Sequence, residues 1–269
     1  MGNRDTQFAG SIPELYDHYL GPVIFQPYAD DLARRIATLR PQAVLETAAG
    51  TGIVTRALIE DLPDAVALIA TDLNQPMLDY AARQTPSSRV AWQQGDALHL
   101  PFDDGAFDAV VCQFGAMFFP DKPAAYREAR RVLKQGGVFL FNVWGPIARN
   151  EFADGVTQAV AALFPDDPPS FLPRIPYGYH DVDVITRELE SAGFASVKIE
   201  TLDVEGRAQS ARHPAIGFCQ GTPLRNEIEA RDPARLGEAT DAAAAALAAR
   251  FGSGAIRGNL QALIIEAQK

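Results

Sequence analysis

The feature that most constrains the fold is a short apolar run that ends in a glycine loop. Residues 43–45 are apolar, and residues 46–52 have the sequence ETAAGTG. An apolar run that stops at glycines is typical of a buried parallel strand, and the spacing over 53–62 predicts a helix directly after it. Glycines at such a turn let backbone N–H groups approach a ligand near a helix N-terminus. Alone, the turn predicts either a ligand-binding loop or a tight turn without a ligand.

Strands and helices alternate along the next hundred residues. Strands are predicted over 67–72, 90–93, 107–113 and 138–143, and helices over 76–83 and 123–133, the latter stopped by the glycines at 136 and 137. This alternation predicts an α/β fold with a Rossmann-like, doubly wound, mostly parallel sheet that binds its ligand at the carboxyl ends of the strands. A last strand over 262–267 predicts an antiparallel edge strand near the C-terminus.

The segments on either side of this core predict coverings for it. Residues 12–39 have helical spacing that Pro22 and Pro27 interrupt, and they predict an N-terminal helical lid over 8–39. Residues 146–180 combine six prolines with several aromatic side chains. Because linkers are poor in aromatic residues, this segment predicts an irregular cap inserted into the fold.

Length and charge limit the class of protein. We expect a single domain over 1–269, with a nucleotide-binding core over 42–145 and the C-terminal half of the sheet, carrying inserted helices, over 181–269. The net charge of −10 disfavours nucleic acid as a partner. No apolar stretch reaches about 18 residues and the chain starts with polar residues, so we expect no membrane span and a cytoplasmic location.

Cysteines and histidines are too few and too scattered for a metal site. The two cysteines, Cys112 and Cys219, lie 107 residues apart, and the four histidines do not cluster in the sequence. We therefore predict neither a bound metal nor a disulfide framework.

Three more polar residues follow the later strands. Asp72 ends the second strand, 20 residues after Gly52, where a carboxylate can accept hydrogen bonds from both hydroxyls of a ribose or can cap the next helix. Asp96 follows the third strand, where it can bind an exocyclic amine or simply form a turn. Gln113 ends the fourth strand and is expected at the same crevice.

These features, in this order, resemble the class I S-adenosylmethionine (SAM)-dependent methyltransferases, in the small-molecule branch related to the ubiquinone/menaquinone methyltransferases. The resemblance runs from about residue 44 to 143. Residues 100–108 (LPFDDGAFD) and 131–137 (RVLKQGG) are typical of that branch. The resemblance implies SAM as cofactor, S-adenosylhomocysteine (SAH) as product, and transfer of a methyl group to an O, N or C atom of a small, aromatic or apolar metabolite. It leaves open whether the protein is a monomer or a homodimer.

The resemblance also implies a set of cofactor-binding residues: Tyr16, Glu46, Ala48, Gly50, Gly52, Asp72, Leu73, Met77, Asp96, Ala97 and Gln113. The glycine loop would surround the methionine part of SAM, and Asp72 would hold the ribose. Leu73 and Met77 would flank the adenine, and Asp96 would bind its edge together with the backbone N–H of Ala97. Many family members have glycine where this chain has Ala48, and many others have alanine.

The residues that act on the acceptor are less defined. A sulfonium methyl group is already activated, so the enzyme mainly aligns the acceptor with it, and no catalytic residue is identified. If a base is needed, the candidates are His18, His180 and Tyr19, although His180 also fits a bystander role before a helix that Asp181 or Asp183 can cap. The candidate acceptor-binding side chains are aromatic, and they could equally form the core of the cap: Phe118, Trp144, Phe171 and Tyr177.

Two other functions remain open. An NAD(P)-dependent oxidoreductase shares the fold and the acidic ribose ligand, but Thr55 stands where its glycine fingerprint has a third glycine, and Asp96 is not part of that fingerprint. A SAM-binding protein without methyl transfer would share the cofactor residues, and the acceptor side with its aromatic cap counts mildly against it.

Overall fold

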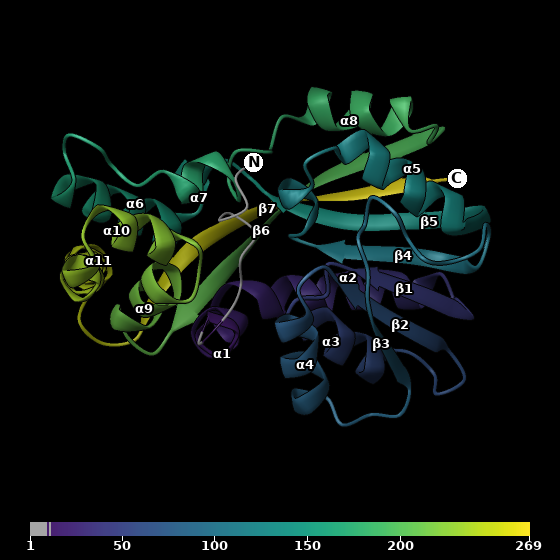
Figure 1. The fold of residues 1–269 in the computed structure, drawn as a ribbon, viewed down its shortest axis with the longest axis horizontal. Coiled ribbons are helices and arrows are strands. Elements are labelled where there is room, and N and C mark those ends of the chain that lie inside the picture. The colour runs from purple at the N-terminus through teal and green to yellow at the C-terminus, as the bar shows by residue number, and fades with distance from the viewer. Residues whose placement is uncertain (1–9, 11) are drawn as a thin grey trace. The chain divides into compact units, whose positions relative to one another are not determined.

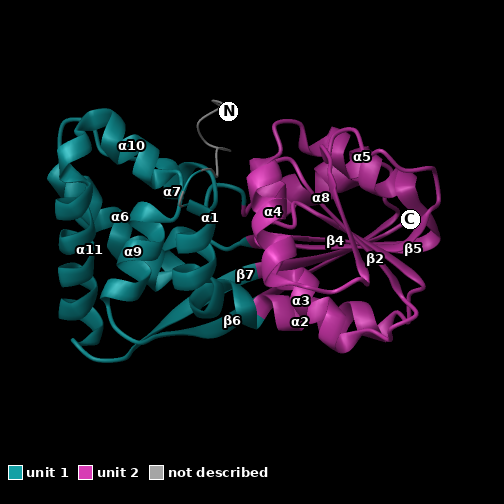
Figure 2. Cartoon of the chain, turned by 60° about the horizontal axis from the view of Figure 1, so that its bottom comes forward, with its two compact units in different colours: residues 1–27, 144–179, 202–262 teal, residues 28–143, 180–201, 263–269 magenta. Residues whose placement is uncertain are grey.

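The computed structural model describes Gly10 and residues 12–269, and the described residues form two compact units (Figure 2). Unit 1 comprises residues 1–27, 144–179 and 202–262, and unit 2 comprises residues 28–143, 180–201 and 263–269. Of the expected lid over 8–39, residues 8, 9 and 11 lie outside the described part. The chain passes from one unit to the other five times. A single domain over the whole length stays a prediction.

One sheet of seven strands, in the order β3-β2-β1-β4-β5-β7-β6, forms the framework of the fold (Figure 1). The strands are β1 (Ala43–Thr47), β2 (Ala67–Asp72), β3 (Val90–Gln94), β4 (Phe107–Gln113), β5 (Leu133–Trp144), β6 (Ser196–Ala208) and β7 (Ile256–Gln268). The first five pair in parallel. β7 runs antiparallel to β5, since the N–H of Lys269 donates to the carbonyl of Gly137 and that of Gly145 to Gln261. The predicted fold class is confirmed. The strand expected over 262–267 is part of β7, and β6 lies outside it at the edge.

Helices cover the sheet of unit 2, which explains why its central strands are mainly apolar and buried. They are α2 (Gln26–Thr38), α3 (Ile53–Asp61), α4 (Gln75–Gln84), the short η3 (Ala116–Phe118), α5 (Lys122–Val132) and α8 (Val182–Ser191). The ring of Tyr126 on α5 packs on Phe139 and Phe141 of β5, with centroids 5.8 and 5.4 Å away. Asp181 caps α8 as the sequence suggests, accepting from the N–H groups of Asp183 and Val184.

Unit 1 is mainly helical. Its helices are α1 (Ile12–Leu15), η2 (Tyr16–Phe25), η4 (Ile147–Arg149), α6 (Glu151–Leu163), α7 (Phe171–Arg174), α9 (Arg212–Gln220), α10 (Leu224–Arg231), η5 (Pro233–Arg235) and α11 (Leu236–Phe251). α11 packs against α6 and α9. Among the described residues, no helix has both the length and the apolar character needed to cross a membrane.

The expectation of an irregular cap over 146–180 is wrong for its first half. Residues 151–163 form the three-turn helix α6, which buries Phe152, Val156 and Val160 at intervals of four residues. Apart from Pro146, the prolines of this segment begin only after α6, so they leave the helix intact.

The prolines of the lid do not interrupt its helix. The described residues are helical from Ile12 to Thr38, and the middle stretch, η2, is a π-helix that contains Pro22. There the N–H of Gln26 donates to the carbonyl of Gly21, five residues earlier. The wider π spacing accommodates a ring that would clash with the carbonyl four residues before it in an α-helix.

The glycines at 136 and 137 do not separate α5 from the next strand. β5 begins at Leu133, directly after α5, and both glycines lie inside it. Gly136 has a φ of +78°, and a Cβ at Gly137 would lie 3.0 Å from the carbonyl oxygen of Asp108. The glycines therefore serve an irregular start of the strand rather than the end of the helix.

Candidate functional site

Four of the predicted cofactor residues lie at the carboxyl ends of neighbouring strands in unit 2. Glu46 is next to the end of β1, Asp72 ends β2, Asp96 follows β3, and Gln113 ends β4. Since these strands are adjacent and parallel in the order β3-β2-β1-β4, their ends lie side by side along one edge of the sheet. The sheet therefore brings together residues that are up to 67 positions apart in the sequence.

The glycine loop between β1 and α3 turns by left-handed backbone conformations. Its φ values are +52° at Ala48, +56° at Gly50 and +79° at Gly52. A Cβ at Gly52 would lie 3.0 Å from the ring of Trp92 and 3.1 Å from the Cβ of Ala81, whereas one at Gly50 would meet no atom within 4 Å. Gly52 is therefore required by packing inside unit 2, while Gly50 borders open space.

Asp72 fastens the glycine loop to the end of β2. Its Oδ2 accepts from the N–H of Gly50 at 2.9 Å, and its Oδ1 accepts from the N–H of Asn74 at 2.7 Å. The side chain is buried, and burial raises the pKa of Asp72, although the surrounding N–H donors lower it. Asn74, not Asp72, is the N-cap residue of α4, so the alternative of a helix cap is wrong.

Glu46 is a buried acid with a hydroxyl partner. It is 3% exposed, and Oγ1 of Thr55 donates to its Oε2 at 2.5 Å. Burial raises the pKa of Glu46 to about 8. In the sequence, Thr55 stands out only as the residue in place of a third glycine. The position of Thr55 on the first turn of α3, nine residues after Glu46, is the signal that could have identified the pair.

The residues expected around the adenine lie beside β2 and β3. Leu73 is 53% exposed, which is unusual for a large apolar side chain, whereas Met77 is buried. Oδ1 of Asp96 accepts from the N–H of Leu98 at 2.9 Å. The N–H of Gly95 donates to the carbonyl of Asp72 at 3.0 Å, so the turn carrying Asp96 starts at the end of β2.

The loops after β1 and β4 are in contact. A Cβ at Gly115 would lie only 2.5 Å from the Cβ of Ala48, so this close approach requires a glycine. Phe114, with a φ of +48°, is held by Asn142 of β5, whose Oδ1 accepts from the N–H of Phe114 at 2.9 Å. Asn142 is fully buried opposite Gln113 and was not among the predicted site residues.

The predicted lid residues belong to unit 1. Tyr16 stacks on Phe25, with centroids 4.7 Å apart. His18 and Tyr19 form a ring cluster with His213, at centroid distances of 6.3 and 5.2 Å from it. His213 lies on α9, far from His18 and Tyr19 in the sequence, and the packing of α9 against η2 brings the three rings together. The roles predicted for Tyr16, His18 and Tyr19 stay predictions.

The candidate acceptor-binding aromatics are divided between the units. Trp144 stacks on Tyr177 in unit 1, with centroids 5.5 Å apart, and Phe171 is buried in the same unit. Phe118 lies in η3 of unit 2 and is half-buried. His180, also in unit 2, directly precedes the Asp181 cap. The acceptor-binding role of these side chains stays a prediction.

Metal ligands are not gathered in the described part of the chain. Among Gly10 and residues 12–269, no group of three or more His, Cys, Asp or Glu side chains is placed to hold a metal ion. Cys112 and Cys219 are both buried, and burial raises the pKa of each thiol to about 12, which makes them poor nucleophiles and ligands at neutral pH.

Comparison with known families bears on this site directly. Residues 45–141, which contain the glycine loop, Asp72, Asp96 and Gln113, match the sequence profile of a family described as a methyltransferase domain. The chain resembles the class I SAM-dependent methyltransferases. The resemblance expected from the sequence is confirmed, and the matched region lies wholly within unit 2.

Curated relatives share this core. A demethylmenaquinone methyltransferase of Lactiplantibacillus plantarum is 41% identical over 97 residues, which are 35% of this chain and 41% of that protein. The ubiquinone/menaquinone biosynthesis C-methyltransferase UbiE of a Caulobacter species is 32% identical over 160 residues, or 56% of this chain and 60% of that protein. The chain thus spans about half the length of the curated relatives that it matches.

Solved structures extend the likeness to the whole fold. The [4+2]-cyclase SpnF is 21% identical, covers 96% of this chain and 93% of its own, and superimposes with a TM-score of 0.58. At this identity the likeness shows the fold alone. Since that protein is described as a cyclase, the methyltransferase fold does not by itself identify the reaction.

Proposed function

We propose that this protein is a SAM-dependent methyltransferase that transfers a methyl group to an O, N or C atom of a small molecule. One observation carries the proposal. Four of the predicted cofactor contacts, Glu46, Asp72, Asp96 and Gln113, lie at the ends of four adjacent strands, inside the segment 45–141 that matches a methyltransferase domain. Ligands of doubly wound sheets bind at this edge, outside the carboxyl ends of the strands.

The residues at this edge suit the cofactor. Asp72 is a carboxylate at the end of β2, the kind of acceptor that holds the two hydroxyls of a ribose, and its bonds from the N–H groups of Gly50 and Asn74 fix its position there. The open space beside Gly50 suits the methionine part of SAM. The exposed side chain of Leu73 suits one face of the adenine, and the turn at Asp96 suits its edge.

The bound cofactor would supply an activated methyl group. The task of the chain is then to hold the acceptor in line with that group and to exclude water from it. Phe118, Trp144, Phe171 and Tyr177 are the aromatic side chains that we propose for a flat or apolar acceptor. If the acceptor must lose a proton, His18, His180 and Tyr19 are the candidate bases.

The names of the relatives suggest the first acceptors to test. Demethylmenaquinone methyltransferases and a ubiquinone/menaquinone C-methyltransferase share the core of this chain, so aromatic and quinone rings lead the list of candidates. A strongly acidic chain is unsuited to nucleic acid, which supports a small acceptor.

Ligand binding and turnover test the proposal in two steps. The full chain is first titrated by calorimetry with SAM, SAH, NAD⁺ and NADH. It is then incubated with SAM and a panel of quinones, phenols and amines while SAH release is measured. We expect SAH to bind in the titration. We also expect one class of acceptor to cause SAH to be produced from SAM in the incubation. Binding of a nicotinamide cofactor without SAM would overturn the proposal in favour of an oxidoreductase. Tight SAM binding without SAH release over a broad panel would favour a SAM-binding protein without methyl transfer.

A further inference from the structure

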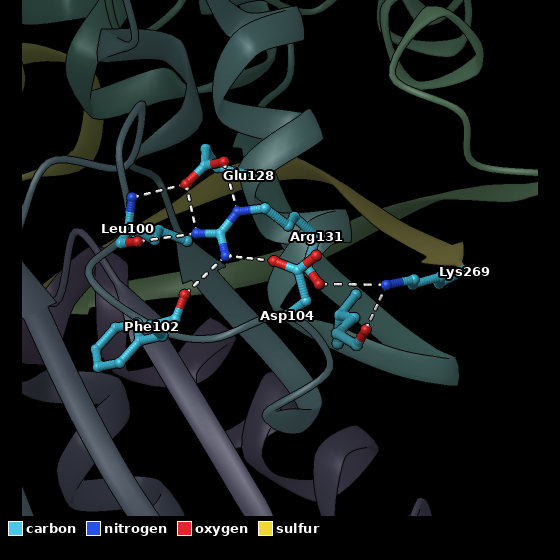
Figure 3. A network of polar contacts seen from close by, with 7 residues as sticks. Leu100, Phe102, Asp104, Glu128, Arg131 and Lys269 are labelled. Carbon is cyan, nitrogen blue, oxygen red and sulfur yellow. Dashed lines mark hydrogen bonds and ion pairs between the residues drawn. The ribbon is translucent and has the colours of Figure 1, made fainter.

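Arg131 of α5 ties the loop between β3 and β4 to the body of unit 2 (Figure 3). Its guanidinium donates to the carbonyl of Leu100 at 2.9 Å, to the carbonyl of Phe102 at 2.7 Å, and to Oδ1 of Asp104 at 2.8 Å. Its own carbonyl accepts from the N–H of Gly105 at 3.0 Å. One residue thus holds four positions of a loop that is distant in the sequence.

Glu128, one turn earlier on α5, fixes the direction of this guanidinium. Its Oε1 accepts from Nε of Arg131 and its Oε2 from Nη2, both at 2.8 Å. The same Oε2 accepts from the N–H of Leu100 at 2.9 Å, so the pair holds both backbone groups of Leu100. All five N–H donors of the guanidinium are used. A lysine, with three donors on one atom, cannot reproduce this fork.

The network orders the loop more than it stabilises the whole fold. The side chains of Arg131 and Glu128 are 31% and 21% exposed, and ion pairs at such positions contribute only about 0–1 kcal/mol to stability. Phe102, which Arg131 holds by its carbonyl, packs edge-on against Phe107 at the start of β4, with centroids 5.2 Å apart. What these bonds determine is the path of the backbone.

The turn that carries Asp96 lies between two anchors. At its start, the N–H of Gly95 donates to the carbonyl of Asp72. Within it, Asp96 accepts from the N–H of Leu98 by Oδ1 and from the N–H of His99 by its carbonyl, both at 2.9 Å. At its end comes Leu100, which is held by Arg131 and Glu128. The position of Asp96 and Ala97 is therefore set from β2 on one side and from α5 on the other.

We propose that Arg131 is a positioning residue for recognition of the cofactor's base. By holding the end of the turn 95–99, it keeps the Asp96 carboxylate and the Ala97 N–H aligned with the edge of the adenine. This inference rests on the proposed function. A carboxylate aligned in this way accepts from the amino group of adenine and rejects a base that carries a carbonyl there, since two acceptors would then face each other.

The test compares two ligands and two variants by calorimetric titration of the full chain. The ligands are SAH and S-inosylhomocysteine, in which hypoxanthine replaces adenine. The variants are Arg131→Met and, as a matched control, Arg130→Met. Arg130 is the residue before Arg131 on the same helix. Its Nε donates at 2.8 Å to the carbonyl of Gly193, in the turn after α8. Both changes remove an arginine that donates to backbone carbonyls, but only Arg131 donates to carbonyls of the loop between β3 and β4.

We expect wild-type protein and Arg130→Met to bind SAH much more tightly than the hypoxanthine analogue. Arg131→Met should weaken SAH binding by about tenfold, the value of one hydrogen bond to a charged group, and should leave the analogue nearly unchanged. The ratio of the two dissociation constants then moves towards one. Amide hydrogen exchange should quicken over 95–105 in this variant and not around Gly193.

An unchanged ratio in Arg131→Met, or an equal loss for both ligands, overturns the inference. If Arg131→Met does not fold, Arg131→Lys, which keeps the charge but not the fork, is judged by the same ratio. Wild-type protein that binds no SAH overturns the proposed function and the inference together. If wild-type protein and the Arg131 variant both prefer SAH to the hypoxanthine analogue by the same ratio, the inference about Arg131 is overturned and the proposed function is not.

Discussion

The backbone N–H of Gly50 donates a hydrogen bond of 2.9 Å to Oδ2 of Asp72. This bond joins the glycine loop after β1 to the end of β2, two segments that the sequence suggests separately as parts of one site. The glycine loop and the Asp72 carboxylate are therefore coupled, and we expect a change at either residue to displace the other.

Replacing Asp72 by asparagine should weaken SAH binding. The amide keeps the size of the side chain but removes its charge and replaces one of its two acceptor oxygens by a donor. We expect the dissociation constant to rise at least about tenfold, the value of a hydrogen bond to a charged group. Calorimetric titration checks this, with Asp79→Asn as the control, because Asp79 is exposed on α4 and accepts there from the side chain of Gln75. Unchanged affinity in Asp72→Asn contradicts the ribose assignment.

Alanine at Gly50 and at Gly52 should have different effects. Both residues have a positive φ, which costs about 1–2 kcal/mol of stability for any other residue. At Gly52 the methyl group would also crowd Trp92 and Ala81, for a further cost of about 1–3 kcal/mol. At Gly50 the methyl group enters open space that we propose for the cofactor, so Gly50→Ala should mainly lose SAH affinity.

Gly136 provides the control for this pair. It has a φ of +78° and no atom within 4 Å of an added Cβ, and it lies at the start of β5. Gly136→Ala should cost about as much stability as Gly50→Ala and leave SAH binding intact. Thermal unfolding measures the stability of the three variants, and calorimetric titration measures their affinity for SAH. Equal affinities for Gly50→Ala and Gly136→Ala would contradict the proposed position of the cofactor.

The stability of the protein should depend on the protonation of Glu46. Burial raises the pKa of Glu46 from 4.5 to about 8, so the folded state binds the proton more tightly than the unfolded state. The stabilising contribution is full below about pH 4.5 and is lost as the pH rises towards 8, by up to about 1.4 kcal/mol per pH unit. Glu46→Gln, which stays neutral, should therefore gain in melting temperature relative to wild type between pH 5 and pH 8. Glu60→Gln, on the exposed end of α3, should not. If the melting temperatures of Glu46→Gln and wild type change with pH in the same way over this range, the raised pKa of Glu46 is contradicted.

Methyl transfer should not require a metal ion. The described residues gather no cluster of three metal-ligating side chains, and an activated sulfonium methyl group needs no Lewis acid. Once an acceptor is found, SAH release should be the same with and without EDTA. Loss of turnover on chelation and its recovery with magnesium would identify a carboxylate site that the sequence spacing conceals.

The strands of the core and the residues at their ends could be predicted because their signals are local. β2 and β4 occupy the predicted residues, since each is a buried apolar run that ends in a polar residue at the edge of the sheet. Asp72 is recognisable from its distance to Gly52, because the length of one strand–helix–strand unit varies little.

The partners of these residues could not be predicted because they come from elsewhere in the chain. Thr55 on Glu46, Asn142 on Phe114, and Arg131 on the loop 100–105 are contacts that depend on how helices and strands pack. The sequence does not predict α6 because prolines follow it closely. It does not predict the π-helix η2 because proline normally ends or kinks a helix, and η2 contains Pro22. Local patterns describe single elements, whereas these features arise where two elements meet.

The five crossings of the chain between the units have a consequence for engineering. The segment that matches known methyltransferases, 45–141, lies wholly within unit 2, while unit 1 is assembled from three separate stretches. β6 and β7 each contribute residues to both units. A chimaera that transplants unit 1 onto a related core must therefore carry all three stretches and keep the register of both strands. Exchange of one contiguous segment would leave each unit incomplete.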